Sequence, residues 1–274
     1  MNLSSLKTIK RILDNHGLKP SRGLGQNFLV DSRAIHRLIS AAQVGKEDTV
    51  LEIGPGLGTL TQELAQRARH VIAIEKDTKM VEILQETLSK YLNVQILHGD
   101  AIKTDYTKYK ILDTGYKVVA NLPYYITAPT IRKFLETDHK PTSLTLIVQK
   151  EVAQRICAKP PRMNILAVSV QVYAAPKIIS YIKKNSFWPQ PQVDAAILQI
   201  TPLPQPYAQD FPKFFTVVKA GFKQPRKQLV NNLSKGLELP REKVGQWLLS
   251  NTIQPTQRAE TLTVQDWRNL SNAL

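Results

Sequence analysis

The sequence has one cysteine, no long apolar run and no cluster of cysteine and histidine, and each shortage excludes a class of protein. The single Cys157 cannot form an internal disulfide, which favours a reducing compartment such as the cytoplasm. Without clustered ligands, no bound metal is expected. No apolar run approaches the roughly 20 residues that cross a bilayer, and residues 1–18 lack the apolar core of a secretion signal. The chain is therefore expected to be a globular cytoplasmic protein that is not bound to a membrane.

Acidic residues are also scarce relative to basic ones. There are 22 Asp and Glu against 37 Lys and Arg, which gives a formal charge of +15. Such a charge favours a polyanionic partner, because basic side chains that neutralise phosphates release counterions. Nucleic acid is the leading candidate, and a surplus that serves only solubility is the alternative.

The pattern of apolar residues predicts an α/β fold. After Gly45, short β-branched runs alternate with helical ones, which is typical of a parallel sheet with helices on both faces. The expected strands are Thr49–Ile53, His70–Glu75, Val94–His98, Lys117–Ala120, Ser143–Gln149, Lys177–Ile182 and Ala195–Ile200. The expected helices among the first ninety or so residues include Ser32–Ala42, Leu57–Arg67 and Thr78–Tyr91.

Prolines indicate a domain boundary. They recur at Pro202, Pro204, Pro206 and Pro212, where neither a helix nor a central strand tolerates them. From Phe211 onward the pattern is helical. We therefore expect a larger domain over residues 1–204, with a helical, basic cap at 1–46, and a small all-helical domain over residues 205–274.

A glycine-rich loop over residues 52–58 follows the first expected strand and opens a helix, the place where a doubly wound sheet binds its ligand. Gly54 and Gly56 let a ligand approach the backbone closely. The spacing differs from the dinucleotide fingerprint, and the loop lacks the lysine of a phosphate-binding loop, which argues against NAD and ATP. The acidic Glu52 suits a cationic ligand better than a pyrophosphate.

Two further carboxylates follow the next two strands. Glu75 lies at about the twenty-residue offset at which an acid binds ribose hydroxyls. Asp100 can accept a hydrogen bond from the exocyclic amine of an adenine. A ribose-binding acid without a phosphate cradle favours S-adenosylmethionine as the cofactor.

The run Asn121-Leu122-Pro123-Tyr124, after the fourth strand, is a candidate site for a flat base with an exocyclic amine. The amide oxygen of Asn121 and the carbonyl of Pro123 can accept both amine hydrogens, while Tyr124 stacks on the base. Four residues alone also fit a strand that turns through proline into a helix, with the tyrosine in the core. Their position favours a base-binding site over a purely structural turn, because all of these motifs follow expected strands and so share one edge of the sheet.

Together these motifs resemble the ribosomal RNA adenine dimethyltransferase family, and the match is close to bacterial members that modify small-subunit rRNA. The resemblance covers nearly the whole chain, through further matches at residues 25–31, 149–152, 187–193 and 257–260. It implies a Rossmann-like, seven-stranded methyltransferase sheet in residues 1–204, as the catalytic domain that binds S-adenosylmethionine. It also implies that the small helical domain behind it, residues 205–274, recognises RNA. It also implies transfer of two methyl groups to N6 of each of two adjacent adenosines in the terminal hairpin of small-subunit rRNA.

The expected roles of individual residues follow from the motifs and the resemblance. The expected cofactor contacts are Asn27, Leu29, Gly54, Gly56, Glu75, Asp100 and Asn121. The expected catalytic residues are Asn121, Leu122, Pro123, Tyr124 and Phe187, of which Phe187 either covers the second face of the target base or forms a rigid turn. The expected RNA-binding residues are Arg22, Lys183, Lys184, Lys223, Arg226 and Lys227. Tyr125 is interpreted as structural, and the chain is expected to act as a monomer on rRNA of the assembling small subunit.

Two departures from the family pattern affect the expected RNA contacts. Trp188 stands where the family usually has a small residue, and Met163-Asn164 replaces a Tyr-Gly pair. Three alternatives stay open: an enzyme that methylates large-subunit rRNA and confers antibiotic resistance, a non-catalytic RNA-binding assembly factor, and a DNA adenine methyltransferase. The opening run at residues 23–29 and Arg258-Ala259-Glu260 favour the small-subunit enzyme over the first alternative.

Overall fold

The computed structural model describes residues 2–21, 23–106, 109 and 115–274, so the expected RNA contact Arg22 lies outside the described residues. Its contacts divide the chain into two compact units. The first comprises Met1–Ala153 and Lys177–Pro202, and the second comprises Gln154–Pro176 and Leu203–Leu274. The longer segment of the second unit begins at Leu203, and the unit also takes in Gln154–Pro176, which lies within the 1–204 range expected for the larger domain. Within the described ranges, no helix has both the length and the apolar character of a membrane span.

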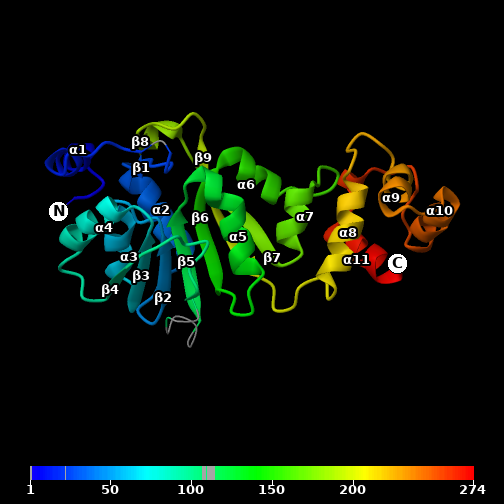
Figure 1. Ribbon diagram of the computed structural model, residues 1–274, viewed down its shortest axis with the longest axis horizontal. Coiled ribbons are helices and arrows are strands. Elements are labelled where there is room, and N and C mark those ends of the chain that lie inside the picture. Colours follow the sequence, from blue (N-terminus) through cyan, green and yellow to red (C-terminus); the bar gives the residue numbers. More distant parts are fainter. Residues whose placement is uncertain (1, 22, 107–108, 110–114) are drawn as a thin grey trace. The chain divides into compact units, whose positions relative to one another are not determined.

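The first unit is built on a seven-stranded sheet of order β4-β3-β2-β5-β6-β9-β7, as the sequence led us to expect (Figure 1). Its strands are β2 (Thr49–Ile53), β3 (His70–Glu75), β4 (Val94–His98), β5 (Tyr116–Asn121), β6 (Ser143–Gln149), β7 (Ala174–Ile182) and β9 (Ala195–Pro202). The ladders from β4 to β6 are parallel, whereas β9 pairs antiparallel with β6. The expectation of a parallel sheet is therefore wrong at β9. The chain reaches β9 from the neighbouring β7 without the helical crossover that a parallel connection uses.

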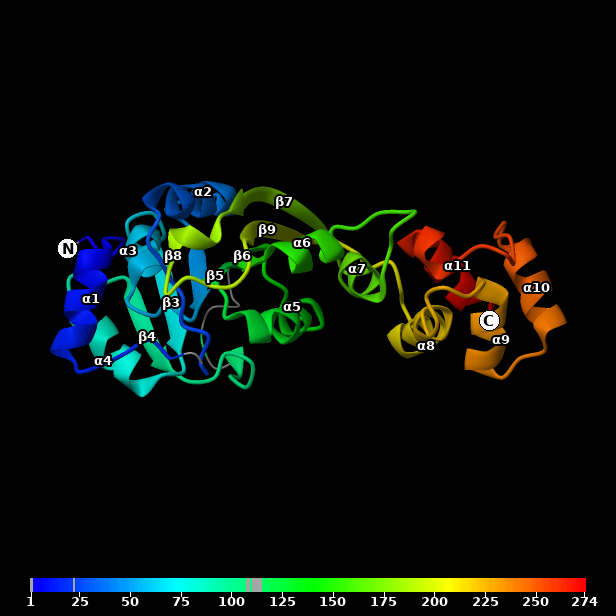
Figure 2. The ribbon, with the colours of Figure 1, turned by 90° about the horizontal axis from the view of Figure 1, so that it is seen from above.

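Helices cover both faces of this sheet (Figure 2). They include α2 (Ser32–Ala42), α3 (Thr59–Ala65), α4 (Thr78–Thr87) and α5 (Thr127–Leu135). The helix α1 (Leu6–Asn15) instead shares an apolar cluster with Met80 and Ile83 of α4, and α6 (Lys150–Ile156) spans the border of the units along the chain. On one face, α2 and α3 pack on Val50, Val71 and Val119. On the other face, Phe134 of α5 lies 6.4 Å from Tyr116 of β5, measured between ring centroids. Alternate residues of β5 therefore point to opposite layers, as the pleat of a strand requires.

A second sheet of only two short strands stands apart from the first. β1 (Phe28–Leu29) pairs antiparallel with β8 (Phe187–Trp188), so that Leu29 lies opposite Phe187. Asp31 anchors both sides of this pair, since its carboxylate caps α2 through the backbone N–H of Arg33 at 3.0 Å and accepts from Ser186 Oγ at 2.9 Å. Two-residue strands carry no periodicity, and the sequence did not predict them.

The second unit is helical. It contains α7 (Ile165–Gln171), α8 (Phe211–Gly221), α9 (Leu229–Leu237), α10 (Arg241–Ser250) and α11 (Val264–Ala273). Phe214 and Trp267 are completely buried in its core. At Gly236 the helices α9 and α8 approach closely, because an added methyl group would lie 2.6 Å from Cβ of Ala220. Thr263 and Asp266 form a capping box that starts α11.

Candidate active site

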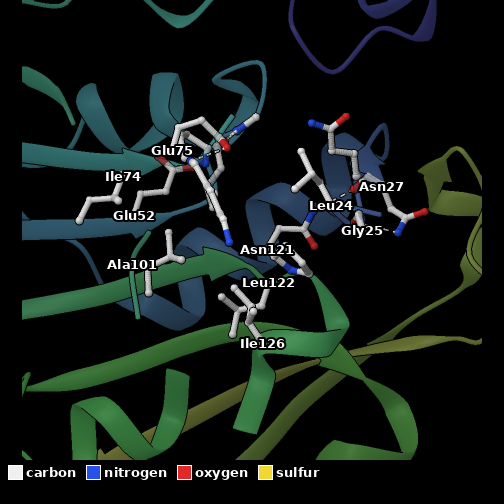
Figure 3. Close-up of a pocket in the computed structure, with 18 of the residues that line it drawn as sticks. Leu24, Gly25, Asn27, Glu52, Ile74, Glu75, Ala101, Asn121, Leu122 and Ile126 are labelled. Atoms are coloured by element: carbon white, nitrogen blue, oxygen red, sulfur yellow. Dashed lines mark hydrogen bonds between the residues drawn. The ribbon is translucent and has the colours of Figure 1, made fainter. Parts of the chain in front are cut away.

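A pocket opens at the carboxyl ends of β2 and β5, where the strand order reverses direction (Figure 3). In doubly wound sheets, ligands bind at such a switch point. The structure brings all the expected cofactor and catalytic residues to this pocket: Asn27, Leu29, Gly54, Gly56, Glu75, Asp100, Asn121, Leu122, Pro123, Tyr124 and Phe187. Their individual roles stay predictions, but their shared location no longer rests on strand order alone.

The glycine loop needs its glycines for conformation. Gly54 and Gly56 have φ angles of +66° and +59°, in the left-handed region that side chains disfavour. The N–H of Gly54 donates to the Ile74 carbonyl at 2.9 Å, which ties the loop to the end of β3. The N–H of Gly56 donates to Oε2 of Glu75 at 3.1 Å. The loop therefore presents bare backbone to the pocket.

Glu75, at the end of β3, is held rigidly. Its Oε1 accepts from the backbone N–H groups of Lys76 at 2.8 Å and Asp77 at 2.9 Å, in addition to the contact with Gly56. Burial raises the pKa of Glu75, while these three hydrogen bonds act in the opposite direction. A fixed, largely buried carboxylate of this kind suits paired hydroxyls, which can donate to it.

Glu52 lies deeper, with only 1% of its surface exposed. Its Oε2 has no hydrogen-bond partner among the described residues, and the residue lines the pocket. Burial raises the pKa of Glu52 to about 8, and the charge of Glu75 acts in the same direction. A buried carboxyl oxygen without a partner is costly, and a cationic group bound in the pocket would favour the ionised form of Glu52 and so lower its pKa again.

Asp100 is paired with a lysine that the sequence reasoning missed. Lys76 Nζ lies 3.0 Å from Asp100 Oδ2, and the N–H of Ile102 donates to Oδ1 at 2.9 Å. Lys76 thereby lowers the pKa of Asp100 and keeps it a hydrogen-bond acceptor. The only signal in the sequence was the position of this lysine, directly after the ribose-binding candidate.

Asn121 is oriented by the chain itself. Its Nδ2 donates to the backbone carbonyl of Asn27 at 3.1 Å, which uses the donor end of the amide and leaves Oδ1 as an acceptor (Figure 3). The Pro123 carbonyl accepts from Ile126 N–H at 3.1 Å, and its second lone pair can accept from another donor. Burial raises the pKa of the half-buried Tyr124 to about 12, so its ring stays neutral. The motif thus combines acceptors with a neutral aromatic face.

Aromatic side chains complete the walls of the pocket. Phe187 is buried, at 3% exposure, and Phe28 lines the pocket although the sequence reasoning passed it over. Tyr125, interpreted above as structural, also lines the pocket, and 55% of its surface is exposed. It is therefore an accessible residue rather than a core residue.

The expected RNA-binding residues fall into two groups. Lys183 and Lys184 are exposed in the first unit, just ahead of Phe187 in the chain. Lys223, Arg226 and Lys227 are exposed in the second unit, where Lys223 and Lys227 line a small cleft together with Lys235. In the part of the chain that the structure describes, no group of His, Cys, Asp and Glu could hold a metal ion.

Comparison with known proteins gives one consistent family. Residues 17–274 match the family model described as ribosomal RNA adenine dimethylase. "Ribosomal RNA small subunit methyltransferase A" of Dehalococcoides mccartyi (strain CBDB1) is 40% identical, over 97% of this chain and 92% of that protein. The protein of the same name from Clostridium botulinum (strain ATCC 19397 / Type A) is also 40% identical, over 97% of this chain and 98% of its own length.

Solved structures agree with this result. A dimethyladenosine transferase from Plasmodium falciparum superposes with a TM-score of 0.75 at 26% identity, covering 88% of this chain and 94% of that one. The 23S rRNA methyltransferase ErmE superposes with a TM-score of 0.74 at 25% identity, covering 90% of this chain and 99% of that one.

Proposed function

The chain belongs to the ribosomal RNA adenine dimethylase family, and from this premise we propose that it methylates N6 of two adjacent adenosines in the terminal hairpin of small-subunit rRNA. The observation that carries the proposal is the pocket itself. It joins a rigid carboxylate, a bare glycine loop and the oriented amide of Asn121 at one switch point. The curated relatives, named as small-subunit enzymes, supply the choice of RNA.

The residues present fit S-adenosylmethionine, the cofactor of this family. Glu52 has a buried oxygen without a partner among the described residues, which suits the positive charge of that molecule. Glu75 can receive its ribose hydroxyls and Asp100 its adenine amine, as the sequence led us to expect. When bound, the cofactor supplies an electrophilic methyl group.

The chain's own contribution is to position the target amine. Adenine N6 is a weak nucleophile because its lone pair is delocalised into the ring. Asn121 Oδ1 and the Pro123 carbonyl would accept its hydrogens and draw electron density toward nitrogen, while Tyr124 stacks on the unstacked base. Holding two reacting groups in line contributes up to roughly 7–11 kcal/mol. The product ammonium is acidic enough to lose its proton to water, so no strong general base is required.

The natural substrate is inferred to be rRNA in a partly assembled small subunit, which places the protein in the cytoplasm. We also infer that it acts as a monomer, because the residues expected to bind the cofactor and the target base already meet in one pocket without a second copy to supply any of them. The strongly positive charge of the chain agrees with a phosphate-rich partner.

The large-subunit enzyme is the one alternative with an observation in its favour, the similarity to the 23S rRNA methyltransferase ErmE. That identity is 25%, against 40% for the curated small-subunit relatives. Incubation with isolated small or large subunits and methyl-labelled cofactor separates the two. We expect label in small-subunit rRNA only; label in large-subunit rRNA would favour the alternative, and no label with intact cofactor binding would favour a non-catalytic assembly factor.

A further inference from the structure

Trp188 does not line the pocket, but it contacts Phe28, which does. It pairs with Phe28 across the two-stranded sheet, and the two rings stack with centroids 6.5 Å apart and an angle of 23° between their planes. Phe28 lines the pocket, whereas Trp188 lies partly buried behind it. Trp188 therefore contacts the wall of the pocket through its stacked partner Phe28.

Phe28 in turn lies against the glycine loop. A methyl group added to Gly56 would meet Cε1 of Phe28 at 3.3 Å, so the ring occupies the space beside the bare backbone. Phe28 also packs in one apolar cluster with Leu57, the next residue of the loop. The loop conformation that Phe28 covers is the one in which Gly56 N–H reaches Glu75.

The N-terminal helix α1 covers Trp188 from another side. Lys10 Nζ lies 5.5 Å from the centroid of the Trp188 ring, and Ile9 and Leu13 of α1 belong to the same apolar cluster. The match to the family model begins at residue 17, after the end of α1. A continuous series of contacts therefore runs from α1 to the glycine loop, through Lys10, Trp188, Phe28 and Gly56.

We propose that Trp188 is a positioning residue which, through Phe28, holds the glycine loop in its cofactor-binding conformation, and that α1 contributes to cofactor affinity by covering Trp188. The inference rests on the proposed use of S-adenosylmethionine. A loop rich in glycine loses much conformational entropy when it orders, and a loop that is ordered in advance binds its ligand at lower cost. The effect therefore belongs to cofactor affinity and not to the methyl-transfer step.

The test is calorimetric titration of the full chain with S-adenosylmethionine, without RNA. We expect Trp188→Ala to raise the Kd by about 10-fold, since the variant has neither the ring stack nor its apolar packing. Trp188→Phe keeps an aromatic ring against Phe28 and should bind within about 3-fold of wild type. Lys10→Met should raise the Kd by roughly 2-fold, and by less when Trp188 is already alanine, because the cation then has no ring to cover. The rate constant at saturating cofactor and small subunits should change little in all three variants.

Trp247→Ala is the matched control, since it removes a tryptophan from α10 in the other unit. It should leave the Kd unchanged even if it lowers the melting temperature. If Trp188→Ala fails to fold, Trp188→Leu and Lys10→Met carry the same test. An alanine variant that binds as tightly as wild type, a phenylalanine variant as weak as alanine, or a loss confined to the rate constant would overturn the inference. Failure of the wild type to bind the cofactor would instead contradict the proposed function.

Discussion

The two ends of the Asn121 side chain have different tasks. The NH2 group donates to the Asn27 carbonyl, so the amide cannot rotate without breaking a hydrogen bond, and the oxygen keeps one orientation. This link also joins the proposed base-binding motif to Asn27, an expected cofactor contact. The sequence indicated that the Asn121 oxygen is an acceptor. The hydrogen bond from its NH2 group to Asn27 joins residues 94 positions apart, so only the structure reveals it.

Replacing Asn121 should therefore damage catalysis more than cofactor binding. We expect Asn121→Ala to lower the rate of methyl transfer by at least about 100-fold, because the amine is no longer oriented, while the Kd for S-adenosylmethionine rises only a few-fold. Asn121→Asp should fail as well, since a carboxylate cannot donate to the Asn27 carbonyl. Single-turnover transfer and calorimetry measure the two effects, and full turnover by Asn121→Ala would contradict the assigned role.

Glu52 predicts a dependence of stability on pH. Its pKa rises from 4.5 to about 8 on folding, so below pH 4.5 both states hold the proton and the group imposes no penalty. As the pH rises toward 8 only the unfolded chain ionises, and the folded state loses up to about 1.4 kcal/mol per pH unit. Relative to Glu52→Gln, the wild-type free energy of unfolding should fall by a few kcal/mol between about pH 5 and pH 8. Denaturant melts without bound cofactor measure it, and parallel curves for the two proteins would refute it.

Among the helices and strands, the sequence predicted the bounds of those that are marked by periodicity or by a capping residue. The bounds of β2, β3, β4, β6 and α2 agree with expectation, because β-branched runs and the Asp31 cap are local signals. The sequence did not predict the strands β1 and β8, because a strand of two residues shows no periodicity. The direction of β9 and the membership of Gln154–Pro176 in the second unit depend on contacts between distant segments, which no local pattern reports.

Two glycines in the helical unit offer a matched pair. A side chain at Gly236 would collide with Ala220, whereas nothing lies within 4 Å of the corresponding position at Gly245. We expect Gly236→Ala to lower the free energy of unfolding by roughly 1–3 kcal/mol through overpacking. Gly245→Ala should raise it by about 0.5–1 kcal/mol, because alanine favours a helix interior. Denaturant titration of both variants checks the pair, and equal effects would contradict the close approach of α9 and α8.

The net positive charge of the whole molecule is expected to set how RNA binding depends on salt. The +15 balance predicts that affinity for the small subunit falls steeply with salt. Reversing Lys223, Arg226 and Lys227 to Glu should weaken subunit binding and flatten the salt dependence by roughly one unit of logarithmic slope for each phosphate that is no longer neutralised. Filter binding over a salt series measures this, with the cofactor Kd as the control that should stay unchanged. An unaltered slope would show that these three side chains face solvent in the complex.

Dimethylation of small-subunit rRNA by this pocket can be measured in cells. Ribosomal RNA from a strain that lacks the protein, and from the same strain supplied with wild type or Asn121→Ala, can be mapped for methylated nucleotides by mass spectrometry. We predict that N6,N6-dimethyladenosine at two adjacent positions in the terminal hairpin of small-subunit rRNA disappears without the protein. Wild type should restore it and Asn121→Ala should not. Persistence of both modified adenosines in the deletion strain, or a change confined to large-subunit rRNA, would show that the protein does not dimethylate small-subunit rRNA.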